Sequence, residues 1–283
     1  MRLQTDMKRL FLFSAYSEDG SVGASVLHYV RVLSSFGDVV FRADNEISEE
    51  GIRLLKPLVS DVQGQRHGEY DFGSYKRAWQ WACANLDVSG YDRLYMVNDS
   101  VFGPLMDMDT LFSRLEEGVP AASCLVYNPA RKHPHMQSWF IGLGKEVFLA
   151  EYFSDFISGV KRMETKEQVC QLYEDGFTRL LMEKGIKPVF LFEARGRAIY
   201  NSPLSFCRKG LPFVKKVAWT RHNGSLGHQL ARIAEEFPGQ GTEAMLSQAR
   251  EMWGKEYVES LMHGGRLDSV RRYMKYLYGK LFK

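Results

Sequence analysis

Short apolar runs alternate with amphipathic stretches along residues 9–97. A buried strand reads as a short apolar run, whereas a helix that packs on a sheet repeats its apolar residues every three or four positions. The expected strands are 9–13, 38–41, 59–62 and 91–97, and the expected helices are 22–35, 49–58 and 72–86. This alternation is typical of βα units, so we expect a nucleotide-binding type of α/β fold with a mixed sheet flanked by helices.

The pattern changes after Pro104. Strands are expected at 119–127, 138–143 and 188–192, and helices at 148–160 and 166–184. The stretch 195–227 has no clear periodicity, whereas the sequence from Gln229 onward is mostly helical. We therefore expect an α/β domain over residues 1–220, followed by a helical region over residues 221–283.

The composition and charge exclude several classes of protein. Of 283 residues, 45% are hydrophobic and 25% are charged, which excludes intrinsic disorder and fibrous proteins. The formal net charge of +3 is too small and too dispersed to require a nucleic-acid partner.

Motif searches exclude further classes. No G-x-S-x-G, Walker A or G-x-G-x-x-G segment is present, which argues against α/β serine hydrolases, P-loop enzymes and Rossmann dinucleotide enzymes. The four cysteines are too far apart for a zinc site or a redox dithiol. No apolar stretch is long enough for a signal peptide or a membrane span, so we expect a cytoplasmic protein, free or attached to a membrane surface.

A polar motif, Asn98-Asp99-Ser100, directly follows the expected strand 91–97. Ligands in open α/β sheets bind beyond the carboxyl ends of the strands, where the strand order reverses. A carboxylate there can hold a donor diphosphate, directly or through Mg²⁺ or Mn²⁺, because both ions favour oxygen ligands. The alternative is a polar turn that caps the next helix.

The segment 70–76 opens an expected helix and is a second candidate. Free backbone N–H groups and the helix dipole attract anions at such a position. Asp71 is also a good N-cap, however, and would then satisfy those N–H groups itself. Taken alone, the segment favours capping over ligand binding.

Polar side chains later in the chain are candidates for catalysis. His133 and His135 are close enough in the sequence to suggest a metal site, but no third ligand stands at a telling distance. A loop that binds the acceptor, or a plain surface loop, is equally possible.

Glu174 and Asp175 are candidate bases, since a carboxylate can take the proton of an acceptor hydroxyl. Adjacent residues of a helix point about 100° apart, so we expect at most one of these acids to face a site; simple solvation is the alternative.

The segment 266–283 predicts a basic amphipathic helix. Its apolar stripe comprises Leu267, Val270, Met274, Leu277, Tyr278 and Leu281, and its basic residues include Arg271, Arg272, Lys275 and Lys283. This pattern fits an anionic membrane interface. It equally fits a last helix that packs on its own domain.

Several of these segments, taken in order, resemble the rhamnan-synthesis family. They are Tyr70-Asp71-Phe72-Gly73-Ser74-Tyr75-Lys76, the stretch from Val97 to Leu105, His135-Met136-Gln137-Ser138-Trp139-Phe140, and Tyr173-Glu174. Pro212-Phe213-Val214-Lys215 resembles a later element of the same family. The resemblance covers residues 10–216.

The resemblance implies a GT-A-like glycosyltransferase that assembles rhamnose-containing cell-surface polysaccharide, such as O-antigen or cell-wall glycan. It implies transfer from dTDP-L-rhamnose to a lipid-linked glycan at the inner face of the cytoplasmic membrane, with inversion at the anomeric carbon. The alternatives are the same scaffold with a different nucleotide-sugar donor, and a non-catalytic subunit that binds a glycan or a nucleotide.

The resemblance also implies roles for individual residues. The implied catalytic residues are Glu174 as the base, Asp99 and His135; the implied donor-binding residues are Asp71, Lys76, Asn98, Asp99, Ser100 and Gln137; and Asp99 is the implied ligand of Mn²⁺ or Mg²⁺. Two departures from the family pattern are visible. Arg66-His67-Gly68-Glu69 stands where the family often has Asn and Gly, and the central motif has one carboxylate where many GT-A enzymes have two.

Overall fold

The structure is a computed structural model that describes residues 7–130 and 132–281. The polar start of the chain, residues 1–6, and the end of the expected basic helix, residues 282–283, lie outside the described residues. The chain divides into two compact units. Unit 1 comprises residues 1–22, 30–99 and 109–195, and unit 2 comprises residues 23–29, 100–108 and 196–283.

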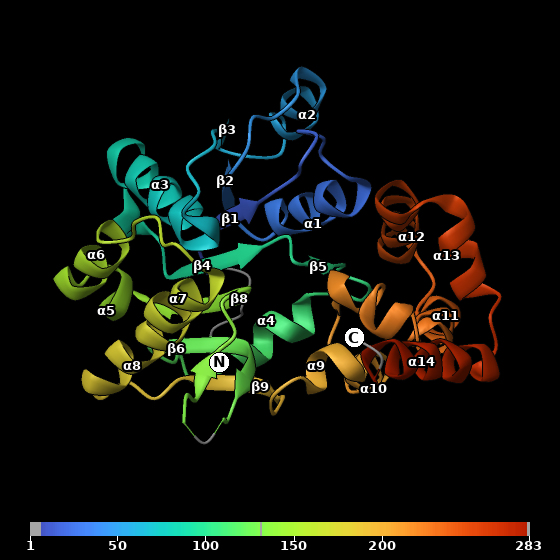
Figure 1. The fold of residues 1–283 in the computed structure, drawn as a ribbon. Coiled ribbons are helices and arrows are strands. Elements are labelled where there is room, and N and C mark those ends of the chain that lie inside the picture. The colour runs from blue at the N-terminus through green and yellow to red at the C-terminus, as the bar shows by residue number, and fades with distance from the viewer. Residues whose placement is uncertain (1–6, 131, 282–283) are drawn as a thin grey trace. The chain divides into compact units, whose positions relative to one another are not determined.

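Unit 1 is built on a mixed β-sheet (Figure 1). Within the described residues, eight strands pair in the order β3-β2-β1-β4-β8-β6-β7, with β9 paired to β6. The strands are β1 (Arg9–Ala15), β2 (Asp38–Ala43), β3 (Asp61–Gly64), β4 (Arg93–Asn98), β6 (Ala122–Asn128), β7 (His135–Met136), β8 (Phe140–Gly144) and β9 (Val189–Glu193). Strands β1 to β4 are parallel, and β8 runs antiparallel to β4 and β6. The expected α/β class and its mixed sheet are confirmed.

The helices of unit 1 follow the expected order with some differences. They are α1 (Ala24–Ser34, which begins in unit 2), α2 (Glu49–Leu55), α3 (Tyr70–Asn85), η2 (Val88–Gly90), α4 (Asp109–Leu115), α5 (Lys145–Phe148), α6 (Glu151–Ser158), α7 (Lys166–Val169), η3 (Cys170–Asp175) and α8 (Gly176–Glu183). The expected helix 148–160 is interrupted, because α5 ends at Phe148 and α6 begins at Glu151. The expected helix 166–184 is present, but η3 is π-helical.

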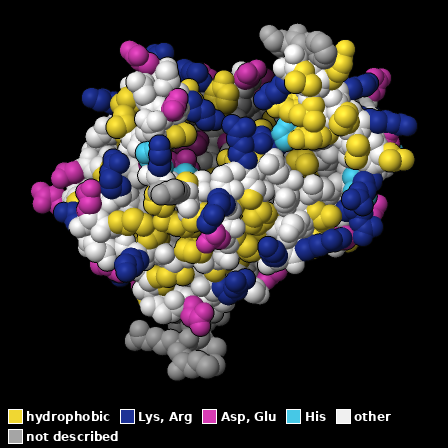
Figure 2. Space-filling view, turned by 60° about the horizontal axis from the view of Figure 1, so that its bottom comes forward, with side chains coloured by type: hydrophobic (Ala, Val, Ile, Leu, Met, Phe, Trp, Pro, Cys, Tyr) yellow, Lys and Arg dark blue, Asp and Glu magenta, His cyan; other side chains and the backbone are white. Residues whose placement is uncertain are grey.

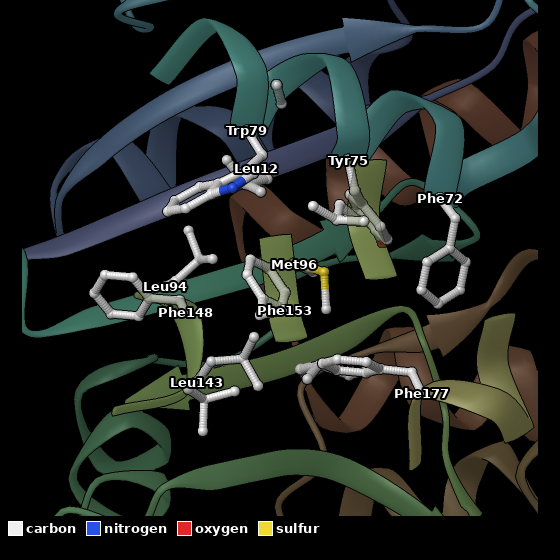
Figure 3. Close-up of a cluster of buried hydrophobic side chains, with 14 of the residues drawn as sticks. Leu12, Phe72, Tyr75, Trp79, Leu94, Met96, Leu143, Phe148, Phe153 and Phe177 are labelled. Atoms are coloured by element: carbon white, nitrogen blue, oxygen red, sulfur yellow. The ribbon is translucent and has the colours of Figure 1, made fainter. Parts of the chain in front are cut away.

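A large apolar core lies between α3 and one face of the sheet. Side chains alternate between the two faces of a strand, so Leu12 of β1 and Met96 of β4 point to this side. Figure 3 shows them facing Tyr75 and Trp79 of α3, with aromatic rings of α5, α6 and α8 completing the cluster. This packing fixes α3, and with it the residues of its first turn, against the sheet.

The opposite face of the sheet holds a buried ion pair among aromatic rings. Arg9 of β1 donates from Nε and Nη2 to the two carboxylate oxygens of Glu116, over 2.6 and 2.7 Å. Tyr95 of β4 donates its hydroxyl to Glu116 over 2.8 Å, and its ring lies 5.3 Å from that of Phe112. The three polar groups satisfy one another inside the core.

Unit 2 is mostly helical, as expected from Gln229 onward. It contains β5 (Val101–Phe102), α9 (Ala198–Asn201), α10 (Pro203–Arg208), β10 (Val214–Lys215), η4 (Lys216–Ala218), η5 (Arg221–Asn223), α11 (Gly227–Glu236), α12 (Gln240–Trp253), α13 (Lys255–Met262) and α14 (Arg266–Leu281). Strands β5 and β10 pair antiparallel. The rings of Phe102, Trp219 and Trp253 pack together, with ring centres 5.7 to 6.0 Å apart. No helix in the described part of the chain combines the length and apolarity that a membrane crossing requires.

Candidate active site at the ends of β1 and β4

The strand order reverses beside β1. The chain runs from β1 outward to β2 and β3, and then places β4 on the opposite side of β1 (Figure 1). Ser14 and Asn98 lie opposite each other in register at the carboxyl ends of β1 and β4. Connections leave two such strands in opposite directions, and the space between them is where α/β proteins bind ligands. The topology therefore points to Ser14 and Asn98 as the floor of a binding site.

Asp71 brings a carboxylate to the same place from the first turn of α3. Its Oδ2 accepts a hydrogen bond from Nδ2 of Asn98 over 2.9 Å, and its Oδ1 accepts one from the hydroxyl of Ser14 over 3.3 Å. The N-cap prediction for Asp71 is wrong, because α3 begins at Tyr70 and Glu69 occupies the cap position. The carboxylate is thus fixed by the ends of two strands rather than by the helix.

Asp99 and Ser100 continue from the end of β4. Asp99 is half-buried, and its backbone N–H donates to the carbonyl oxygen of Ser14 over 3.1 Å. Ser100 belongs to unit 2, where its hydroxyl accepts a hydrogen bond from Nζ of Lys215 over 3.0 Å. Lys215 is the last residue of the segment that resembles the family's later element, and nothing in its spacing could have predicted this partner.

Lys76 is held by protein groups. Its Nζ lies 3.0 Å from Glu69 Oε2 and also donates to the carbonyl of Val160. Burial alone would raise the pKa of Glu69, but hydrogen bonds from Arg77 and Lys76 outweigh it and lower that pKa. The structure places the ammonium group of Lys76 in this ion-pair cluster. Its predicted contact with a nucleotide stays a prediction.

Glu174 contacts the segment that leads into β8. Its Oε1 accepts hydrogen bonds from the backbone N–H and the hydroxyl of Ser138, over 2.8 and 3.0 Å. Tyr75 of α3 donates to the carbonyl of Ser138 over 3.1 Å, and the next carbonyl, that of Trp139, accepts from the N–H of Asn98 over 3.2 Å. Residues 138–139 therefore connect Glu174 to the Asn98–Asp71 pair.

Both adjacent acids contact the 133–138 segment, Glu174 through Ser138 and Asp175 through the histidines. The expectation that at most one of them faces a site stays a prediction. Asp175 lies 3.0 Å from Nδ1 of His135 and 3.5 Å from Nδ1 of His133. The acids lie at the end of η3, whose i→i+5 bonding gives more residues per turn than an α-helix and reduces the angle between neighbours. Burial raises the pKa of Asp175, and His135 partly opposes that rise.

Gln137 lies inside this segment and is buried. Its Oε1 accepts a hydrogen bond from the indole N–H of Trp139 over 2.8 Å, and its backbone N–H donates to Val126. In this arrangement Gln137 positions Trp139, while the predicted contact with a donor sugar is not tested.

Sequence reasoning missed Asp44, which follows β2 directly. Its Oδ1 accepts the backbone N–H groups of His67 and Gly68 over 2.7 and 2.8 Å. His67 in turn accepts the N–H of Glu69 at Nδ1, and its Nε2 lies 3.1 Å from the hydroxyl of Ser74. Asp44 thus organises the loop in which this chain departs from the family pattern. The signal that could have identified Asp44 is its position just after an expected strand.

A pocket of about 550 Å³ opens beside this corner, at the carboxyl ends of β1 and β2. Among the residues that line it are Tyr16, Asn45 and Arg66. The guanidinium of Arg66 lies 5.2 Å from the centre of the Tyr16 ring, within the range of a cation–π contact. The pocket has the size of a small-molecule site and combines a ring, an amide and a cation.

The described residues contain no cluster of three or more His, Cys, Asp and Glu side chains that could hold a metal ion. Mg²⁺ and Mn²⁺ rarely need one, because such ions use one or two carboxylates and take the remaining ligands from substrate phosphates and water. Asp99, Asp71 and Ser14 offer only oxygen ligands. This donor set fits a hard cation that is shared with a diphosphate.

The fold and these groups define an α/β protein with acidic side chains at the carboxyl edge of its sheet, a candidate ligand site. The sequence model of the family described as Rhamnan synthesis protein F matches residues 39–253, more than half of the chain. The chain belongs to this family, and the match continues beyond Lys216, where the motifs ended. Family membership supports a glycosyltransferase of polysaccharide synthesis.

Several solved structures are similar at low sequence identity. One, described as a nucleotide-diphospho-sugar transferase from Desulfovibrio desulfuricans, is 15% identical, with 81% of this chain and 96% of that chain covered and a TM-score of 0.40. A cytidylyltransferase from Leptospira borgpetersenii is 12% identical, with coverages of 91% and 98% and a TM-score of 0.40. The mannosyltransferase Ktr4p from S. cerevisiae is 10% identical, with coverages of 54% and 60% and a TM-score of 0.33. A comparison with curated proteins finds no match.

Proposed function

We propose that this protein transfers L-rhamnose from dTDP-L-rhamnose to a growing lipid-linked cell-surface polysaccharide, with inversion of the anomeric carbon. The observation that carries the proposal is the convergence of Asp71, Asn98 and Asp99 at the reversal of strand order. Glu174 is linked to Asn98 by two hydrogen bonds through residues 138–139. Membership of the Rhamnan synthesis protein F family supports rhamnose as the transferred sugar.

In this mechanism the donor diphosphate lies over the ends of β1 and β4. Asp99 would hold a Mg²⁺ or Mn²⁺ ion, whose charge would stabilise the leaving diphosphate. Asp71, fixed by Asn98 and Ser14, keeps the floor of the site in place. The pocket beside Tyr16 and Arg66 is of a size to take the nucleoside, whose base would stack on the ring.

Glu174 is the proposed base. An acceptor hydroxyl oxygen attacks the anomeric carbon as the bond to the diphosphate oxygen breaks, so that dTDP leaves with the electron pair. The proton of the hydroxyl passes to Glu174. Ser138 holds one carboxylate oxygen through two hydrogen bonds, which fixes the orientation of the base. His135, paired with Asp175, is proposed to contact the acceptor side.

The test is calorimetric titration with dTDP-rhamnose, UDP-glucose and GDP-mannose, with and without Mn²⁺, combined with an assay of nucleoside diphosphate release. We expect metal-dependent binding of dTDP-rhamnose, lost in Asp99→Ala and kept in Asp155→Ala, an exposed acid on α6. Preference for another nucleotide sugar would change the donor but keep the site. Binding without turnover for any acceptor would instead indicate a non-catalytic subunit.

A further inference from the structure

Helix α14 (Arg266–Leu281) lies at the surface of unit 2, and none of its described residues is buried. Leu267, Tyr278 and Leu281 are 73%, 66% and 80% exposed, and Val270, Met274 and Leu277 are also exposed. Figure 2 shows hydrophobic side chains gathered beside Lys and Arg side chains at the upper right of the view, where this helix lies. An apolar patch of this kind marks an interaction site rather than scattered surface residues.

The helix packs on its own unit through its polar side. Ser269 accepts a hydrogen bond from the N–H of His228, Arg272 donates to Ser260, and the ring of Tyr276 lies 4.7 Å from that of His222. At 3.6 residues per turn these inward residues form one stripe, and the apolar residues form the stripe on the opposite side. A helix that belongs to a domain core shows the reverse arrangement.

The apolar stripe is bordered by positive charge on both sides. The described part of the helix carries five cations, Arg266, Arg271, Arg272, Lys275 and Lys280, against one acid, Asp268. A pocket of about 430 Å³ beside the stripe is lined by Arg271, Arg272 and Lys275 together with Asn223, Ser260 and Asp268. Its guanidinium and ammonium groups can bind phosphate oxygens.

We infer that α14 lies in the interface of an anionic phospholipid bilayer, with its apolar stripe among the acyl chains and a lipid phosphate in the Arg271–Lys275 pocket. Charge complementarity selects this occupant. In a two-fold contact between copies of this chain, the cations that border the stripe would face their counterparts across it and repel. Anionic headgroups neutralise them instead, and a basic border around an apolar face is the arrangement that interfacial helices use.

The experiment is sedimentation of the full chain with phosphatidylcholine vesicles that either contain or lack phosphatidylglycerol. We expect binding to the phosphatidylglycerol vesicles, at least tenfold weaker binding to phosphatidylcholine alone, and a loss with rising salt. The variant Leu267→Ser/Met274→Ser/Leu281→Ser and the variant Arg271→Glu/Lys275→Glu should each weaken binding at least tenfold. Because all five side chains are exposed, both variants should keep the wild-type Tm.

Matched controls are Met252→Ser, an exposed apolar residue of α12, and Lys255→Glu, an exposed cation of α13; both should bind like wild type. Equal binding to the two kinds of vesicle, or undiminished binding by the triple Ser variant, would overturn the inference. So would a dimer that the triple variant abolishes in the absence of lipid. Donor turnover on a water-soluble acceptor should be unchanged in every variant, so this result is independent of the proposed reaction.

Discussion

The side chain of Asn98 donates a 2.9 Å hydrogen bond to the carboxylate of Asp71, which joins the end of β4 to the first turn of α3. Asn98 is buried and Asp71 is half-buried, so the bond lies at the border between the core and the site. It orders a carboxylate at the carboxyl edge of the sheet before any ligand arrives.

A double-mutant cycle can measure this relationship. Since a hydrogen bond to a charged group contributes about 1.5–3 kcal/mol when buried, and Asp71 is partly exposed, we expect Asp71→Ala and Asn98→Ala to be coupled by about 1 kcal/mol in urea unfolding. Both single variants should also weaken donor binding. Asn98→Ala combined with Asp155→Ala should be additive. Additivity between Asp71 and Asn98 would refute the structural role of the bond.

The Glu174→Gln variant tests whether residue 174 acts as the base, because Gln keeps the position of the side chain but not its ability to take a proton. The amide oxygen of Gln can still accept the hydrogen bonds of Ser138, but it cannot take a proton from the acceptor hydroxyl. We expect kcat to fall by about 10²–10⁴-fold with donor affinity and Tm unchanged. The control is Glu167→Gln, at an exposed position of α7. A variant with wild-type kcat would remove Glu174 from the chemistry.

Removal of one partner of the buried pair Arg9–Glu116 should strongly destabilise unit 1. Glu116→Ala leaves a buried guanidinium and the Tyr95 hydroxyl without their acceptor, so we expect a loss of about 3–5 kcal/mol in the free energy of unfolding. Glu117→Ala, at the exposed neighbouring position, should change it by less than about 0.5 kcal/mol. Denaturant unfolding measures both. Equally small losses of unfolding free energy in the two variants would show that the ion pair does not stabilise unit 1.

His67 should make stability fall in mild acid. Burial lowers its pKa below the ordinary value of 6.5, with Asp44 partly opposing the shift. A histidine whose pKa is lowered on folding stabilises the fold fully above the unfolded pKa, and this contribution is lost as pH falls through the folded pKa. We expect His67→Gln to flatten the decline of Tm below about pH 6.5. An unchanged decline would assign it to other groups.

The periodicity of the sequence predicted the elements whose apolar faces meet the core. The strand that ends at Asn98 and the helix that contains Tyr75 and Trp79 were both expected, because their side chains are buried at the periods of a strand and a helix. The two-residue strands β5, β7 and β10 were not expected, since they are too short to show a period. The expectation of an unbroken helix over 148–160 was wrong for a related reason. Apolar residues continue from α5 through Leu149–Ala150 into α6, so the interruption leaves no mark in the pattern.

The candidate site was predictable only as a set of residue types. The local preference of Asp71 for a cap is overridden by Asn98 and Ser14, which reach it from strands distant in the chain. Periodicity also could not show that η3 is π-helical and turns Glu174 and Asp175 toward one segment. The apolar stripe of α14 was visible in the sequence, but its outward direction depends on the hydrogen bonds that Ser269 and Arg272 make on the other side.

The threading of the chain through its two units affects its synthesis on the ribosome. Residues 100–108 are made before residues 109–195 of unit 1, yet they belong to unit 2. The ring of Phe102, fully buried in the finished protein, packs on Trp219 and Trp253. Domains fold from the amino end as they emerge from the ribosome. The β5 segment is therefore synthesised, and unit 1 is finished, before Trp219 and Trp253 are available to pack on Phe102. During that interval the nascent chain exposes an apolar segment, which is the kind of segment that chaperones protect from aggregation.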